Sequence, residues 1–515
     1  MSDKGITKVK SSRSGGARAT IVAILVIVQC LIVIIPTLFL REYGTIAFVV
    51  LEICNVLGII LLSIDNRSLS YKFSWMSAML IFPISGLIMF MLWGHRRKQV
   101  KLNAKIAEKS IKNDKYQDYD RPLLDSFSEM HPVSSRMTRY MYAMGSPLYA
   151  NNDVKYYSTG ESAIDAMIED LEQAKDFILM EFFIVAEGEV WNRVHEILVR
   201  KVREGVEVNL IADDFGSMFR TSVDFAERLE EEGINIRIFN PIHKYFHNFY
   251  MNFRTHEKIV VIDGNVAYTG GFNLADEYAN LIERFGYWKD AGIRVKGDVV
   301  KSVVLTFMDM WMAMNDNDID VTRYLKDDME YCGEKYCHAL KDGPAYRTYS
   351  YVENVYEQMI NYAGNKLYIM TPYLILPEKI MQDLIEARIR GVDVRIITPG
   401  IPDKKYVKRL TEYNYGNLLK AGIRVFEYEQ GFVHSKVIMN EHCAVVGSIN
   451  MDYRSFYLHF ENGIWVYDKE FTAEVNEDFE NTFGKCREIS YEQWLQRPFK
   501  HKAYQAFFNI LSPLI

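Results

Sequence analysis

Long apolar runs lie near the N-terminus of the chain, and shorter stretches with strand-like and helix-like patterns follow them. Three apolar runs, at 19–40, 45–64 and 73–94, each approach or reach the roughly 20 residues that span a bilayer. Beyond them, short apolar runs typical of buried strands alternate with stretches of helical spacing, such as Ile164, Met167, Ile168 and Leu171. Strands that alternate with helices predict crossover units and a largely parallel sheet. The pattern therefore predicts an α/β protein preceded by N-terminal transmembrane helices.

The α/β part is internally repeated. Gly205-Val-Glu-Val matches Gly391-Val-Asp-Val, and Gly233-Ile-Asn-Ile matches Gly422-Ile-Arg-Val, at similar offsets. Matches of this kind indicate two copies of one structural unit. We therefore expect a basic tail at 1–18, a transmembrane region at 19–94, a basic linker at 95–150, a first domain at 151–335 and a second domain at 336–515.

Each predicted domain contains a histidine and a lysine two positions apart. His256-Glu-Lys258 precedes Asp263-Gly264 and Gly270-Gly-Phe-Asn273, and His434-Ser-Lys436 precedes Gly447-Ser-Ile-Asn450. In an extended strand, residues i and i+2 point to the same face, so each histidine lies beside its lysine. A histidine can attack phosphorus while an ammonium group neutralises the phosphate oxygens. Two such cassettes predict one phosphate-directed active site built from two halves.

The pattern leaves alternatives for the acidic residue of each cassette. Asp263 with Gly264 is a strong hairpin signal, so Asp263 is either the acid of the site or only a turn residue. Gly270 follows His256 by fourteen positions, whereas Gly447 follows His434 by thirteen, so the second turn is one residue shorter. Glu441 and Asn440 compete for the equivalent position. Strand parity favours Glu441, because it lies an odd number of residues from its histidine, as Asp263 does.

The repeated pattern resembles the signature of the phospholipase D superfamily, and the flanking residues resemble bacterial cardiolipin synthases. The resemblance implies two phospholipase D-like α/β sandwich domains forming one active site, in which a phosphatidyl group passes from one phosphatidylglycerol to another through a phosphohistidine and glycerol leaves. It implies that no cofactor and no metal take part. The expected catalytic residues are His256, Lys258, Asp263, His434, Lys436 and Glu441, with Asn273 and Asn450 contacting the substrate phosphate.

Several alternatives stay open within this resemblance. We assign His256 as the nucleophile because its cassette is complete, and His434 as the acid/base, although the reverse assignment would use the same residues. A phospholipase D that uses water would share them too. A non-catalytic phospholipid-binding membrane protein is a third possibility, but its expected mark, a lost histidine or lysine, is absent from both cassettes.

Charge and cysteine usage limit the partners. The formal net charge is −7, which argues against a nucleic-acid surface. The six cysteines are too few and too scattered for a disulfide framework, which fits a reducing compartment. Cys332, Cys337 and His338 resemble half of a metal site, but no second half follows at a suitable spacing. The expected partners are phosphatidylglycerol, other anionic phospholipids and the bilayer itself; the oligomeric state is undetermined.

Basic flanks set the expected topology. A signal peptide is the competing interpretation of the run at 19–40, but that run is long and lacks an Ala-x-Ala site, so a retained anchor is favoured. The strongest basic flank extends from Arg96 to Lys112. Because lysine and arginine concentrate on cytoplasmic flanks, we expect a multi-pass protein of the bacterial plasma membrane with a cytosolic catalytic domain. The leader is basic too, so the number and orientation of the spans stay open.

Overall fold

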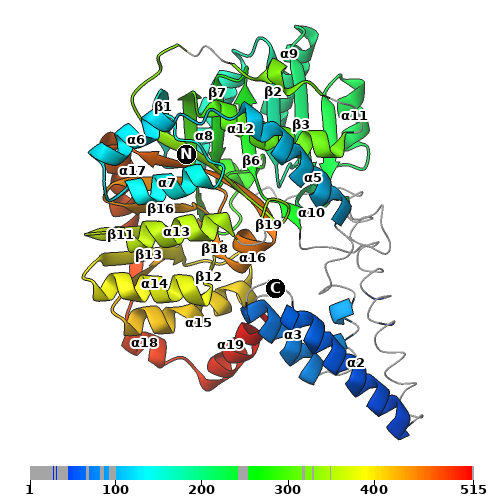
Figure 1. The fold of residues 1–515 in the computed structure, drawn as a ribbon, viewed down its shortest axis with the longest axis vertical. Coiled ribbons are helices and arrows are strands. Elements are labelled where there is room, and N and C mark those ends of the chain that lie inside the picture. The colour runs from blue at the N-terminus through cyan, green and yellow to red at the C-terminus, as the bar shows by residue number, and fades with distance from the viewer. Residues whose placement is uncertain are drawn as a thin grey trace, which may run out of the picture.

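The computed structural model describes residues 100–512 apart from 242–252, 316–318, 327–329 and 348–349. Before residue 100 it describes 27, 31, 44–64, 69–81, 86–87 and 89–91. Within these ranges the chain forms two sheets of matching topology, with helices on their faces (Figure 1). The predicted α/β class is confirmed, but the first sheet is mixed rather than largely parallel.

The first sheet is seven-stranded. In spatial order its strands are β1 (Asn152–Tyr157), β9 (Gly292–Gly297), β7 (Val266–Gly270), β6 (Lys258–Ile262), β2 (Phe177–Phe182), β3 (Glu207–Asp213) and β4 (Asn235–Phe239). Strands β2, β3 and β4 run parallel, whereas the β2–β6, β6–β7, β7–β9 and β9–β1 pairs are antiparallel. Strand β6, which begins at Lys258, therefore lies at the centre of the sheet. It pairs with β7, as the hairpin prediction requires.

The second sheet repeats this order. Its strands are β10 (Tyr336–Asp342), β19 (His459–Tyr467), β17 (Cys443–Gly447), β16 (Val437–Asn440), β11 (Lys366–Met370), β13 (Asp393–Pro399), β14 (Arg424–Tyr428) and an additional β20 (Cys486–Ile489). Gly270 pairs with Gly292 in the first sheet, and Gly447 pairs with Gly463 in the second. The two cassettes thus occupy equivalent places in the two halves. A short pair of strands, β12 (Leu374–Ile375) and β18 (Met451–Asp452), lies beside the second cassette.

Helices connect the strands and cover the sheets. Those of the first half are α8 (Gly160–Leu171), α9 (Glu189–Arg203), α10 (Asp214–Ser217), α11 (Phe225–Glu231) and α12 (Val300–Met314), with short 3₁₀ turns at Asp276–Ala279 and Val321–Tyr324. Those of the second half are α13 (Tyr351–Asn361), α14 (Glu378–Ile389), α15 (Lys405–Lys420), α16 (Tyr453–Tyr457), α17 (Lys469–Phe483), α18 (Tyr491–Leu495) and α19 (Phe499–Leu511). Local capping fixes several starts: the Thr159 hydroxyl accepts from Ser162 N, and the Ser350 hydroxyl accepts from Glu353 N.

A core shared by both halves holds the sheets together. Helix α12 is buried along nearly its whole length, as expected of a helix that is apolar all round. Its side chains join one continuous apolar cluster with residues of α17 and of strands from both sheets, among them Ile259, Val446 and Phe479. Because this cluster crosses between the halves, their relative position is fixed by burial rather than by a flexible hinge.

The expected linker at 95–150 is not a linker. Residues 100–143 form α5 (Val100–Asn113), α6 (Arg121–Met130) and α7 (Ser135–Ala143), with a 3₁₀ turn at Asp114–Tyr116. Leu124, Phe127, Met137 and Met141 are buried in the core of the second half, whereas Ile106 belongs to the shared core. The apolar positions follow spacings of three and four, but the helices are short and highly charged, which hides the pattern.

Among the described helices, two fall within the expected transmembrane region. They are α2 (Gly44–Ile64), which covers the second apolar run, and α3 (Leu69–Ile81), which covers the start of the third. The first run, at 19–40, lies almost wholly outside the described residues. Among the helices that the structure describes, none combines the length and the apolar character needed to cross a membrane.

Candidate active site

Two strands that pair across the halves bring the histidines to one place. Strand β5 (Arg254–Thr255) of the first half runs parallel to the start of β19 in the second, and His256 N donates to Phe460 O at 2.8 Å. Strand β15 (Gly431–Val433) of the second half runs parallel to β8 (Tyr287–Lys289) in the first, and His434 N donates to Lys289 O at 2.7 Å. Each histidine is therefore attached to the opposite half.

Each imidazole is held by a carboxylate of the half to which it is attached. His256 Nδ1 lies 3.0 Å from Glu461 Oε2, and His434 Nδ1 lies 2.7 Å from Asp290 Oδ2. Both carboxylates are fully buried. With Nδ1 engaged in this way, each ring keeps Nε2 for chemistry, and a carboxylate stabilises an imidazolium wherever one forms.

The lysines of the cassettes are buried beside the histidines. Lys258 Nζ donates to the carbonyl of His256, and Lys436 Nζ donates to the carbonyl of His434. An ammonium group has three donors, so each lysine keeps donors for a ligand. Burial lowers the pKa of Lys258 to about 7 and that of Lys436 to about 8. An anionic ligand between them would restore full charge, because an opposite charge favours the ammonium form.

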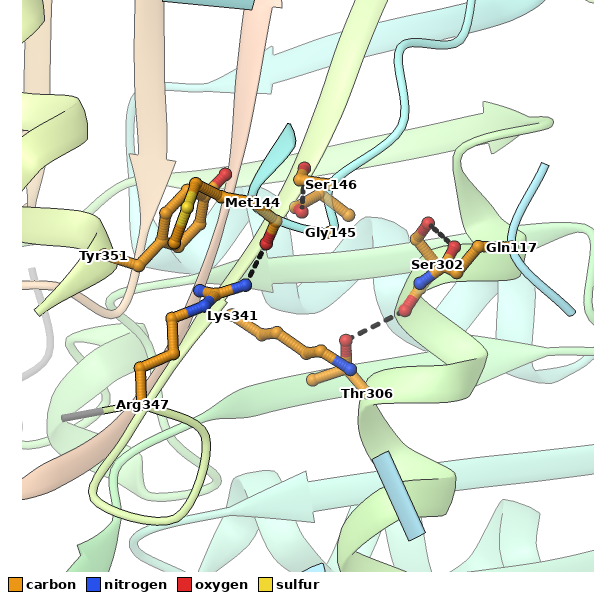
Figure 2. A pocket seen from close by; sticks show the side chains of 10 residues that line it. Gln117, Met144, Gly145, Ser146, Ser302, Thr306, Lys341, Arg347 and Tyr351 are labelled. Atoms are coloured by element: carbon orange, nitrogen blue, oxygen red, sulfur yellow. Dashed lines mark hydrogen bonds between the residues drawn. The ribbon is translucent and has the colours of Figure 1, made fainter. Parts of the chain in front are cut away.

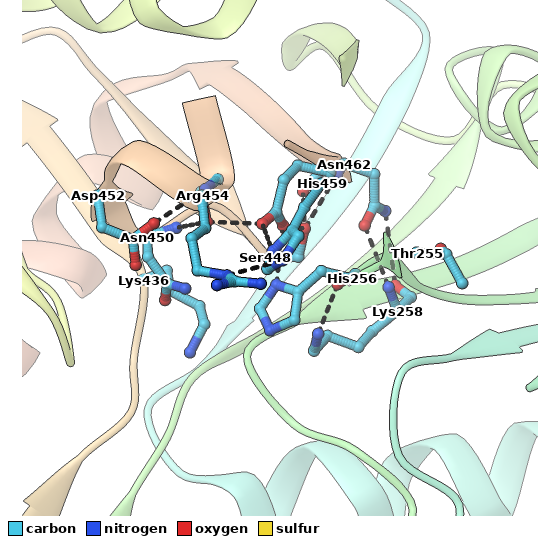
Figure 3. A network of polar contacts seen from close by, with 12 residues as sticks. Thr255, His256, Lys258, Lys436, Ser448, Asn450, Asp452, Arg454, His459 and Asn462 are labelled. Atoms are coloured by element: carbon cyan, nitrogen blue, oxygen red, sulfur yellow. Dashed lines mark hydrogen bonds and ion pairs between the residues drawn. The ribbon is translucent and has the colours of Figure 1, made fainter. Parts of the chain in front are cut away.

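Both imidazoles are neutral in the free site. Burial is the largest cause that lowers the pKa of His256 well below its usual range, and the charges of Lys258, Lys436 and His434 add to it. Burial and Lys436 lower the pKa of His434 to about 4, although Asp290 opposes them. The charge of Lys436 lowers the pKa of both His256 and Lys258, so the second cassette acts on the first. Figure 3 shows Lys436 and Asn450 of the second cassette beside His256 and Lys258 of the first, as the predicted convergence of the cassettes requires.

The prediction that Asp263 and Glu441 hold the imidazoles is wrong. The Asp263 carboxylate accepts from the backbone N–H groups of Lys175, Asp176 and Phe177, which open β2. The Glu441 carboxylate accepts from those of Gly364, Asn365 and Lys366, which open β11. These two acids are equivalent to each other, as strand parity predicts, but they cap strand starts at the turn, at the far end of the strand from the histidine.

Turn chemistry explains why these acids stay at the hairpin. Asp263 and Gly264 both have positive φ, at 52° and 64°, which is the backbone of the Asp-Gly turn. In the second half, Asn440 Oδ1 accepts from His442 N and Cys443 N, so it closes the shorter turn. Asn440 is likewise a turn residue. The first hairpin is thus formed by the backbone of Asp263 and Gly264, and the second is closed by the Asn440 side chain, which satisfies local backbone donors.

The acids that do hold the imidazoles were missed, although the repeat contains a signal for them. Asp290 stands two residues before Gly292-Ile, and Glu461 stands two residues before Gly463-Ile. Because Gly292 and Gly463 occupy equivalent strand positions, Asp290 and Glu461 are equivalent. Neither lies near its partner histidine in the sequence. Only the pairing of β5 with β19 and of β8 with β15 brings the acid and the histidine together.

Glu461 and Asp290 have different surroundings, which explains why the second cassette has a serine where the first has a glycine. Glu461 accepts from the Ser455 hydroxyl at 2.6 Å and from the Ser448 hydroxyl. At the position of Ser448 the first cassette has Gly271, where an added Cβ would lie only 2.0 Å from Asp290 Oδ1. The shorter aspartate therefore requires glycine, whereas the longer glutamate is completed by serine.

A ring packs on each catalytic-site histidine. In the first half this ring is Trp288, centred 5.2 Å from His434, and its Nε1 donates to Asp290 at 3.4 Å. In the second half the equivalent residue is His459, centred 5.5 Å from His256. Arg454 Nε donates to His459 Nε2 at 3.4 Å, which leaves the proton on Nδ1, and that nitrogen lies 3.7 Å from Glu461. His459 thus takes the place of the indole.

The two cassette asparagines are buried at the same site. Asn273 Oδ1 accepts from Ile184 N at 3.0 Å. Asn450 Oδ1 is buried and has no hydrogen-bond partner within the described part of the chain. Ligand atoms of His256, His459 and Glu461 lie within 4.8 Å of one another, so these three residues have a donor set that could hold a metal ion. No group that includes Cys332, Cys337 or His338 was found among the described residues.

A small cavity elsewhere belongs to a different part of the molecule (Figure 2). It is lined by the residues 144–146 that follow α7, by residues of α12 and β10, and by Arg347, whose guanidinium lies 4.5 Å from the Tyr351 ring and donates to Met144 O. Lys341 reaches Asp309 at 2.7 Å. No cassette residue lines this cavity, and its two cations are already engaged by protein groups.

Comparison with known proteins adds family relationships to this geometry. A family model described as "Cardiolipin synthase, PLD-like domain" matches residues 167–284 and 356–483. An uncharacterized protein of Streptococcus mutans is 38% identical over 86% of this chain and 96% of its own length. A cardiolipin synthase of Geobacillus kaustophilus is 31% identical over 91% of this chain and 94% of its own length.

The fold is also found in a solved structure. The crystal structure of phosphatidylserine synthase from Haemophilus influenzae has a TM-score of 0.56 and 15% sequence identity, and the match covers 74% of this chain and 100% of that one. At this identity the likeness concerns the fold alone. Together with the family model, it supports the predicted phospholipase D-like α/β fold.

Proposed function

This chain belongs to the cardiolipin synthase family with phospholipase D-like domains, and from that premise we propose that it transfers a phosphatidyl group between two phosphatidylglycerol molecules. The observation that carries the proposal is the crossed pairing of His256 with Glu461 and of His434 with Asp290. Binding of a phosphodiester anion favours a proton on His434, whereas His256 stays neutral. Two imidazoles and two buried lysines suit such an anion. They provide one nucleophile, one proton carrier and two cations.

In the first step, His256 Nε2 attacks phosphorus and the bond from phosphorus to the glycerol oxygen breaks. The leaving oxygen takes a proton from His434 Nε2. Glu461 compensates the positive charge that develops on His256, and Lys258 and Lys436 neutralise the non-bridging oxygens. The products of this step are a phosphatidylated His256, a neutral His434 and free glycerol.

In the second step, the headgroup hydroxyl of another phosphatidylglycerol gives its proton to His434 and attacks the same phosphorus. The P–N bond breaks, which returns His256 to its neutral form and His434 to its protonated form. One phosphodiester is exchanged for another, so the reaction balances without a nucleotide. Asn273 and Asn450 would orient the headgroup oxygens. We assign His256 as nucleophile because its partner, Glu461, also receives two serine hydroxyls and is the more fixed acid.

We also propose that the protein is anchored in the bacterial plasma membrane by its N-terminal region, with the catalytic halves in the cytosol. Helix α2 supports this, because it exposes several large apolar side chains: Ile53, Val56, Leu57, Ile60, Leu61 and Ile64. The basic run that begins at Arg96 supports the orientation. Anionic phospholipids would then be the substrates of the catalytic halves and would also surround the N-terminal region.

The test is direct. The full chain in membranes or detergent receives phosphatidylglycerol labelled in the headgroup glycerol, without nucleotide and with a chelator present. We expect cardiolipin and free glycerol in equal amounts. Phosphatidic acid in place of cardiolipin would indicate a hydrolase, and no product at all would indicate a phospholipid-binding protein; either result would contradict the proposal.

A further inference from the structure

The C-terminal helix α19 turns a polar side toward the protein and an apolar side outward, which is the reverse of an ordinary surface helix. Its Gln505 is fully buried: it donates to Glu412 of α15 at 3.2 Å and accepts from Arg497 at 3.0 Å. A surface helix of a globular protein normally turns its apolar stripe to the core and its polar side to solvent. Here a polar residue makes the contact with the protein.

The apolar side of α19 is exposed. Phe499 is 82% exposed and Phe507 is 48% exposed. With Ala503, Ala506 and Ile510, these phenylalanines occupy helical positions i, i+4, i+7, i+8 and i+11, which lie on one face. Contiguous exposed apolar surface of this kind indicates a partner or a membrane.

This face continues into the N-terminal helices. Helix α19 packs against α3, and the Ser74 hydroxyl donates to Ile510 O at 2.6 Å (Figure 1). Helix α3 exposes Leu69, Phe73 and Leu80, at 77%, 58% and 79%. The surface of α19 is therefore an extension of the apolar surface that the proposed membrane anchor presents.

The charges on α19 indicate what covers its apolar face. Helix α19 has no acidic residue, and the exposed Lys500 and Lys502 flank its apolar stripe. Basic residues beside an apolar stripe bind the surface of an anionic bilayer. Thirteen residues are too short to cross a bilayer, at about 1.5 Å of rise per residue. The geometry suits a helix that lies in the plane of the interface.

We propose that α19 lies on the anionic lipid surface beside the N-terminal anchor, as a second membrane contact that orients the second half toward its lipid substrate. This inference rests on the proposed membrane-bound phosphatidyl transfer. Helix α19 packs on α15, and α15 contacts β12, which pairs with β18 directly after Asn450. A docked α19 would thus be connected through packed elements to the substrate side of the second cassette.

The experiment uses the full chain in nanodiscs that contain phosphatidylglycerol and a phospholipid with a photoreactive group in its acyl chain. After illumination, peptide mapping locates the lipid adducts. We expect adducts on residues 499–511 as well as in the N-terminal region, which serves as the internal control. The triple variant Lys500→Glu, Lys502→Glu and Phe507→Ser should lose the adducts on α19 and keep those of the N-terminal region.

The matched control is Ile389→Ser on α14, because Ile389 is 75% exposed but lies outside this surface. For the triple variant we expect KM for phosphatidylglycerol in vesicles to rise by about fivefold or more, since interfacial binding scales with apolar and basic contact. Turnover of a short-chain monomeric analogue should be unchanged in both variants. Adducts confined to the N-terminal region would overturn the inference. A wild type that forms no cardiolipin would instead overturn the proposed function.

Discussion

Replacing Glu461 by glutamine isolates the charge that supports the proposed nucleophile. The Glu461 carboxylate lies 3.0 Å from His256 Nδ1, is fully buried and accepts from two serine hydroxyls. Glu461→Gln keeps the shape of this side chain but removes its charge. The His256 ring then has no carboxylate to stabilise the imidazolium that forms when Nε2 attacks phosphorus.

The geometry sets the size of the effect. Two unit charges about 4 Å apart interact by about 4 kcal/mol at an effective dielectric constant of about 20. Since about 1.4 kcal/mol corresponds to a tenfold change in rate, loss of this interaction in the transition state should lower kcat on the order of 10³-fold. The ground state is affected less, because His256 is neutral there. We therefore expect kcat to fall while KM changes little.

The assay compares four isosteric variants by release of headgroup glycerol. Glu461→Gln and Asp290→Asn remove the carboxylates that contact the histidines. Asp263→Asn and Glu441→Gln remove those that cap β2 and β11. We expect kcat of the second pair to stay within about threefold of wild type, while Tm falls by about 2–4 °C for each kcal/mol of lost capping. The reasoning fails if Glu441→Gln is crippled and Glu461→Gln is nearly normal.

His256→Ala and His434→Ala should each abolish transfer, and the double variant should be no worse than either single variant, because the two groups act as one unit; additive losses measured by glycerol release would contradict this. Because the pKa of His434 is about 4 and its protonated form starts the reaction, kcat/KM should fall as pH rises from 6. The fall should steepen near pH 7–8, where Lys258 and Lys436 lose their protons, and a rate that increases from pH 6 to 8 would refute the assignment. His459→Trp should keep turnover within about threefold, since Trp288 already serves His434 in this way, whereas His459→Leu should lose about tenfold and alter the pH profile. A cysteine placed at Lys112, whose side chain is 62% exposed, should react with an impermeant thiol reagent only after cells are opened; labelling of intact cells would reverse the topology.

Local patterns in the sequence predicted the fold class, the repeat and the convergence of the two histidines. The spacing of His256 and Lys258 fixes their common face, and Asp263-Gly264 fixes the hairpin, because both depend on neighbouring residues only. The hairpin also explains the main error. Asp263 is used by the turn it forms, so it cannot serve the histidine at the other end of its strand.

The true partners of the histidines could not be predicted from neighbouring residues. Glu461 stands 205 positions from His256, and only the parallel pairing of β5 with β19 makes them adjacent. The substitution of His459 for Trp288 depends on the same register. The helices at 100–143 were missed for a different reason, because their short apolar stripes are recognisable only once the core that covers them is known.

The central claim is that one histidine carries the phosphatidyl group between two halves of a single site. It is tested most directly by stopping the reaction of the wild-type chain with phosphatidylglycerol during the first turnover and measuring the intact protein by mass spectrometry, followed by peptide mapping. The intermediate is resolved only when a second phosphatidylglycerol gives its proton to His434, so it should be present during that first turnover. We predict a mass increase of one phosphatidyl group on the peptide that contains His256. An unmodified protein that still releases glycerol, or a phosphatidyl group on any other residue, would contradict the account.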